Sequence, residues 1–61
     1  MNFNIIKVPG FEILEIYRDG IYEYYVRPYG KNDYIFIFGV RDRFKDGQLR
    51  VLADNGYFQE A

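Results

Sequence analysis

The chain has 61 residues, of which 49% are apolar and 21% aromatic, and its formal net charge at neutral pH is −1. It contains no serine, threonine, cysteine, histidine or tryptophan. These absences exclude hydroxyl and thiol nucleophiles other than tyrosine, histidine general bases, disulfides and thiolate–imidazole metal sites. Proteins that bind the nucleic-acid backbone usually carry a clearly positive net charge, which this chain lacks.

The length predicts a single small domain over residues 1–61. A domain of this size buries only about 60% of the surface of its unfolded chain, and small domains often gain stability from a disulfide, a metal or a partner subunit. Since cysteine and histidine are absent, a partner is the expected source. No secretory signal core and no apolar run long enough to span a bilayer is recognisable, which favours a cytoplasmic protein that makes no membrane contact.

Turn signals divide the first two thirds of the chain into short runs rich in isoleucine, valine, tyrosine and phenylalanine. The turns are Pro9-Gly10, Asp19-Gly20 and the segment 28–33. The runs between them favour strands, predicted over residues 3–8, 11–17, 21–27 and 34–40. Because the connections are too short for the crossover that parallel strands require, we expect an antiparallel meander.

The connection Asp19-Gly20 predicts the register of the second and third strands. Both residues tolerate positive φ, as a two-residue type I′ turn requires, whereas a three-residue loop would oppose Glu15 to Glu23. The two-residue turn puts one set of side chains on a face that is predicted to be core: Phe11, Ile13, Glu15, Tyr17, Tyr22, Tyr24 and Val26. The opposite face mixes apolar and charged residues: Glu12, Leu14, Ile16, Arg18, Ile21, Glu23, Tyr25 and Arg27.

The fourth run, residues 34–38, is apolar on both of its faces. Such a run is typical of a strand that is covered on both sides or that lies inside a sheet. The alternating charges of residues 41–46 follow it and predict a solvated connection.

The last third of the chain allows two interpretations. As a helix, Asp46 is the N-cap, Leu49, Leu52 and Ala53 form an apolar stripe, and Gly56 ends the helix. As strands, the same residues form further hairpins and close an all-β small barrel of five to six strands. That alternative opposes Arg43 to Arg50, so we prefer the helix. The predicted fold class is therefore α+β, a four-stranded antiparallel β-meander with one short C-terminal helix.

The predicted sheet has more surface than the helix can cover. Four strands of about seven residues give a face of roughly 23 by 19 Å, and a helix of about nine residues covers about a third of it. The mixed face has nothing in this chain to cover it unless the sheet curls into a barrel. Contiguous exposed apolar surface marks an interaction site.

This surface predicts a non-enzymatic protein that needs no cofactor or metal and acts by contact with another protein, or with itself as a homodimer. Compact inhibitors or regulators of larger host enzymes and defence complexes, of the kind that phages and mobile elements carry, are one such class. The candidate contact residues lie on the mixed face and around the 28–33 loop: Glu12, Ile16, Arg18, Glu23, Tyr25, Arg27, Tyr29 and Tyr34.

Two alternatives remain open. Tyrosines interleaved with arginine on a sheet also suit single-stranded nucleic acid, whose bases stack on aromatic rings, although Glu12 and Glu23 share that face. The protein could instead be a structural accessory subunit of a larger assembly. The carboxylate pairs Asp42–Asp46 and Glu12–Glu15 match no recognised metal or acid–base motif, and a chain this short leaves little room for a catalytic pocket.

Overall fold

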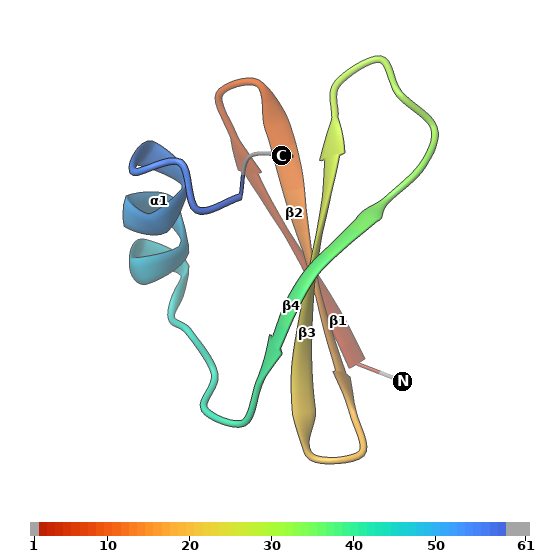
Figure 1. The fold of residues 1–61 in the computed structure, drawn as a ribbon, viewed down its shortest axis with the longest axis vertical. Helices are drawn as coiled ribbons and strands as arrows, with labels where there is room; N and C mark the ends of the chain where they lie inside the picture. Colours follow the sequence, from red (N-terminus) through yellow and green to blue (C-terminus); the bar gives the residue numbers. More distant parts are fainter. Residues whose placement is uncertain (1, 59–61) are drawn as a thin grey trace.

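The computed structural model describes residues 2–58, which form four strands followed by one helix (Figure 1). The elements are β1 (Asn2–Val8), β2 (Phe11–Arg18), β3 (Ile21–Pro28), β4 (Ile35–Val40) and α1 (Asp46–Asp54). The strands make one antiparallel sheet in the order β1-β2-β3-β4. The α+β meander is confirmed, with each strand boundary within one residue of the prediction. The barrel alternative is wrong, because the sheet stays open with β1 and β4 at its edges.

The predicted register of β2 and β3 is confirmed. Asp19 and Gly20 have φ values of 54° and 80°, as a type I′ turn requires. Arg18 lies opposite Ile21, and Glu12 lies opposite Arg27 at the far end of the hairpin. Since side chains alternate along a strand, this register fixes the face on which every side chain of β2 and β3 lies.

The helix packs against one face of the sheet, called the covered face here, and Figure 1 shows it beside the strongly twisted strands. The apolar stripe of α1 is confirmed: Leu49 is fully buried, and Leu52 and Ala53 pack against the same cluster. The buried core consists of Ile6, Val8, Ile13, Tyr24, Val26, Leu49 and Phe58.

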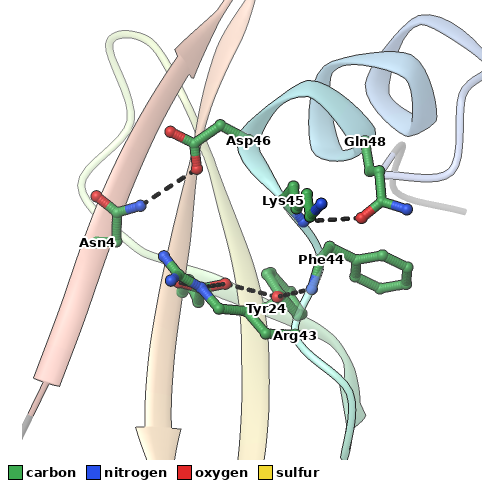
Figure 2. A network of polar contacts seen from close by, with 8 residues as sticks. Asn4, Tyr24, Arg43, Phe44, Lys45, Asp46 and Gln48 are labelled. Carbon is green, nitrogen blue, oxygen red and sulfur yellow. Dashed lines mark hydrogen bonds and ion pairs between the residues drawn. The ribbon is translucent and has the colours of Figure 1, made fainter.

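The start of α1 differs from the prediction. Lys45, with φ −77° and ψ 157°, is the N-cap residue, and Asp46 is already the first residue of the helix. The prediction of Asp46 as N-cap is wrong: the helix starts one residue earlier than that, and the Asp46 carboxylate accepts a hydrogen bond from Asn4 Nδ2 at 3.5 Å. The Gln48 side chain accepts the backbone N–H of Lys45 at 2.9 Å instead (Figure 2). Asp46 still lies in the first turn, where a negative charge is favoured by the helix dipole.

The end of α1 is as predicted. Gly56 has a φ of 80°, which a residue with a side chain adopts only with strain. Its N–H donates to the Ala53 carbonyl, and the N–H of Tyr57 donates to the Leu52 carbonyl, both at 3.0 Å. This pair of bonds is the Schellman arrangement that ends many helices at a glycine.

The placement of β4 corrects one expectation. The prediction that residues 34–38 lie inside the sheet or are covered on both sides is wrong, because β4 is an edge strand and Phe36 is 54% exposed. The physical reason is that the chain leaves β4 for the helix, so no further strand pairs with it among residues 2–58. Tyr24 pairs with Phe38 and Tyr25 with Phe36, so Ile37 is the extra residue of a β-bulge.

A buried carboxylate links the sheet to the connection between β4 and α1. Glu15, on the covered face, is only 4% exposed. The Tyr24 hydroxyl donates to Glu15 Oε2 at 2.6 Å, and Arg43 Nε donates to Glu15 Oε1 at 3.1 Å. The Tyr24 oxygen also accepts the backbone N–H of Phe44 at 3.2 Å, and Figure 2 shows this bond. The network therefore joins β2, β3 and the segment that leads into the helix.

Aromatic rings pack around the same point. The Tyr24 ring centroid lies 5.6 Å from those of Phe38 and Phe44, and 6.4 Å from that of Phe58. Phe58, which follows the turn at Gly56, is 1% exposed and so brings the end of the described chain back onto the covered face. Such tilted and edge-on ring pairs add to the stabilisation from burial alone.

Replacing Leu49 tests how far the core depends on α1. We expect Leu49→Ala to lower the free energy of unfolding by about 2–4 kcal/mol, because it removes a fully buried side chain and leaves a cavity. Val51→Ala is the matched control on the same helix, since Val51 is 58% exposed and should change stability by less than about 0.5 kcal/mol. Urea denaturation followed by circular dichroism measures both, and equal losses would contradict the packing described.

The buried Tyr24 hydroxyl predicts a loss of stability at high pH. Burial, together with the hydrogen bond to Glu15, raises the pKa of Tyr24 well above its ordinary value. The contribution of the neutral hydroxyl is therefore complete below about pH 10 and is lost as the pH rises above the ordinary tyrosine pKa towards the folded one. In a titration followed by tyrosinate absorbance, Tyr24→Phe should remove the last phase. The control Tyr57→Phe, at an exposed position, should leave that last phase in place.

Candidate interaction surface

The face of the sheet opposite α1, called the open face here, has no second layer among residues 2–58, since the helix packs on the covered face. The strand registers place alternate residues of each strand on it. These residues are Phe3, Ile5 and Lys7 of β1, Glu12, Leu14, Ile16 and Arg18 of β2, Ile21, Glu23, Tyr25 and Arg27 of β3, and Phe36 of β4.

An apolar row crosses the centre of the open face. Ile5, Leu14, Tyr25 and Phe36 lie directly opposite one another on the four successive strands. The row is about 14 Å long, since neighbouring strands lie about 4.8 Å apart. Its ends are the most open part: Ile5 is 42% and Phe36 54% exposed. The Phe36 ring packs edge-on against Tyr25, with ring centroids 5.4 Å apart.

A second row extends the apolar surface towards the β2–β3 turn. Phe3, which is 66% exposed, lies opposite Ile16, and Ile16 lies opposite Glu23. Further along, Ile21 packs over the backbone of Gly39, where a Cβ atom would come within 3.0 Å of Ile21 Cγ2. The apolar surface of the open face therefore extends from the central row over β1 and β2 towards the β2–β3 turn.

At one end of the open face a charged pair is held together by a tyrosine. Glu12, which is 4% exposed, accepts hydrogen bonds from Arg27 and from the Tyr34 hydroxyl, the latter at 3.0 Å. The Arg27 guanidinium also lies 5.0 Å from the centroid of the Tyr34 ring, within the range of a cation–π contact. Burial and the bond to Glu12 raise the pKa of the Tyr34 hydroxyl. This hydroxyl therefore stays a donor to Glu12 at neutral pH.

The other charged pair lies on the far side of the apolar row. Arg18 Nε is 3.4 Å from Glu23 Oε1, and the Tyr25 hydroxyl donates to the same oxygen at 3.0 Å. Desolvation and this bond raise the pKa of Tyr25. Each glutamate of the open face thus has an arginine and a tyrosine as partners. An apolar centre between polar ends is the usual anatomy of a protein–protein interface.

The structure places most of the predicted contact residues on one surface. Glu12, Ile16, Arg18, Glu23, Tyr25 and Arg27 lie on the open face, and Tyr34 borders it at Glu12. Tyr29 lies apart. Its hydroxyl donates to the Val8 carbonyl at 2.8 Å and its N–H to the Gly10 carbonyl at 3.4 Å, which puts it beside the β1–β2 turn.

Sequence reasoning missed three exposed apolar residues of this surface, Phe3, Ile5 and Phe36. A signal was present for the first two, because a two-residue turn at Pro9-Gly10 puts Val8 opposite Phe11 and fixes the faces of β1. Phe36 carried no such signal, since the bulge at Ile37 breaks the alternation along β4.

A hollow of about 380 Å³ lies elsewhere, and its lining includes Asn2, Asn4, Glu15, Tyr17, Tyr22 and Arg43. Its two charged groups, Glu15 and Arg43, are bonded to each other. In the part of the chain that the structure describes, no group of three or more acidic residues could hold a metal ion. No helix in residues 2–58 is long and apolar enough to cross a bilayer.

Comparisons with protein-family models, with curated proteins and with solved structures found no match for this chain. Function is therefore inferred from the residues of the open face and from the contacts between them.

Proposed function

We propose that this protein is a binding module that contacts another protein through the open face and acts by that contact rather than by catalysis. The observation that carries the proposal is the apolar row Ile5–Leu14–Tyr25–Phe36, which is exposed at both ends and flanked by paired charges. The partner surface that fits it has an apolar centre and a polar periphery.

The charge arrangement favours a protein over a nucleic acid as the partner. Arg18 is paired with Glu23 and Arg27 with Glu12, so both arginines of the strands already have an anionic partner. A strand of nucleic acid would have to replace these contacts with phosphate, and the two glutamates would oppose it. Tyr25 and Tyr34, the rings best placed for stacking on bases, also hold those glutamates through their hydroxyls.

The mode of action that we propose is inhibition or regulation of a larger enzyme or complex in the cytoplasm, of the kind carried by phages and mobile elements. A module of 61 residues that has no serine, threonine or cysteine nucleophile and no histidine base would act by occupying a surface of its partner. A structural accessory subunit would use the same face. Co-purification at a fixed stoichiometry from the native source distinguishes that role from a transient contact.

Phe36→Lys tests the open face directly. The variant puts a charge at the exposed end of the apolar row, so we expect partner binding to weaken by about tenfold or more. The control is Val51→Lys, which adds the same charge at a residue of similar exposure on the helix. Quantitative affinity capture from the native source compares both variants with the natural protein. Equal retention of the partner by Phe36→Lys would overturn the proposal.

Oligonucleotide binding distinguishes a nucleic-acid partner from a protein partner. We expect no binding of a labelled single-stranded oligonucleotide at low salt, because the arginines of the open face are neutralised within the sheet. Binding that weakens steeply as salt is added would instead support a nucleic-acid platform. Loss of that binding in Tyr25→Leu and Arg27→Gln would locate it on this face.

A further inference from the structure

Within residues 2–58, no strand pairs with the outer edge of β1. Val8 and Phe11 close a two-residue loop and form a hydrogen-bonded pair, so Asn2, Asn4, Ile6 and Val8 bond to β2. The alternate residues Phe3, Ile5 and Lys7 therefore direct their N–H and C=O groups away from the sheet. Their side chains lie on the open face.

The two edges of the sheet are not alike. From residue 2 to residue 6, β1 has no charge, no proline and no irregularity in its pairing. Proteins protect exposed edges with such features, and β4 has one of them, the bulge at Ile37. The structure thus protects the β4 edge with a bulge and leaves residues 2–6 of β1 regular and uncharged.

Only one end of the β1 edge is closed. Arg50 Nη1 of α1 donates to the Lys7 carbonyl at 3.0 Å, so this outward acceptor of β1 already has a partner. The outward groups of Phe3 and Ile5 have no such cover from the helix within the described residues. An added strand can therefore pair at Phe3 and Ile5 but not at the Lys7 carbonyl.

We propose that two copies of this chain pair through β1 in antiparallel orientation, with Asn4 on the two-fold axis. Phe3 then lies opposite Ile5 of the partner subunit, and each such pair exchanges two backbone hydrogen bonds. The apolar side chains of the two subunits meet on the open face. No like charges are opposed over residues 2–6, because this segment has none.

Arg50 selects this register over its neighbour. Pairing centred on Ile5 would require the N–H of Phe3 of the partner subunit to donate to the Lys7 carbonyl, which Arg50 occupies. Pairing centred on Asn4 makes its hydrogen bonds between Phe3 and Ile5 of the two chains and needs none at that carbonyl. In Figure 2 the Asn4 amide nitrogen points to Asp46 and its oxygen points away from the helix.

The dimer would join the two open faces into one surface of twice the width. Its two-fold axis is perpendicular to the sheet, so both helices lie on one side and both apolar rows on the other. Phe3 and Ile5 of the two subunits form the junction between the rows. The inference goes beyond the proposed function, since it concerns the edge of β1 and stands whether or not a different protein binds the face.

Single cysteines test the register, because the natural chain has none. Asn4 and its symmetry mate form a non-hydrogen-bonded pair with Cα atoms about 4.5 Å apart, which suits a disulfide. We expect Asn4→Cys to cross-link under mild oxidation about tenfold faster than Ile5→Cys, whose Cα atoms would lie about 8–9 Å apart. Adding Arg50→Ala to Ile5→Cys frees the Lys7 carbonyl and should speed its cross-linking. Equal rates for the two single variants would overturn the register.

Sedimentation equilibrium tests the dimer itself. At about millimolar chain concentration we expect twice the 7.4 kDa mass of one chain, with dissociation on dilution. Ile5→Pro removes an outward N–H and no bond to β2, so it should give a monomer, whereas the control Ile5→Val should remain a dimer. A monomer for the natural protein would overturn the proposal. If circular dichroism shows that Ile5→Pro does not fold, the cross-linking rates of Asn4→Cys and Ile5→Cys test the dimer in its place. Phe36→Lys should stay dimeric, which separates this result from the test of the proposed function.

Discussion

The carboxylate of Glu15 is the constraint on which the arrangement of this small domain depends. A carboxylate that is 4% exposed is tolerated only when it is paired and hydrogen-bonded. Its partners, Tyr24 and Arg43, come from β3 and from the connection to α1. The Tyr24 hydroxyl also accepts the backbone N–H of Phe44. One buried charge thus ties the register of the hairpin to the path by which the chain reaches its helix.

Buried and half-buried glutamates have different roles on the two faces of the sheet. On the covered face, Glu15 draws the connection onto the core and so holds α1 on that side. On the open face, Glu12 and Glu23 each bind an arginine and a tyrosine. With no serine, threonine or histidine in the chain, tyrosine hydroxyls supply the neutral side-chain donors to these carboxylates. The apolar row is left uncovered between the two polar ends.

The sequence was informative where local chemistry decides the structure. The Asp19-Gly20 turn permits one register, and that register assigns every face of β2 and β3, including most of the predicted contact residues. The helix end at Gly56 follows from the same kind of local requirement. The pairing of Arg43 with Glu15 spans 28 residues and could not be predicted, because it depends on the path of the whole connection. The edge position of β4 and the burial of Phe58 are likewise set by tertiary packing.

The order of the strands has a consequence for how the chain folds. Each strand pairs with its sequence neighbour, so the sheet is built by closing short loops, which is fast. The contacts of α1 with β1 instead bridge 42 residues between Asn4 and Asp46, and 43 between Lys7 and Arg50. We expect the helix to dock last and to detach first. Before it docks, the sheet exposes apolar side chains on both faces, and this species is the one most prone to aggregate during synthesis.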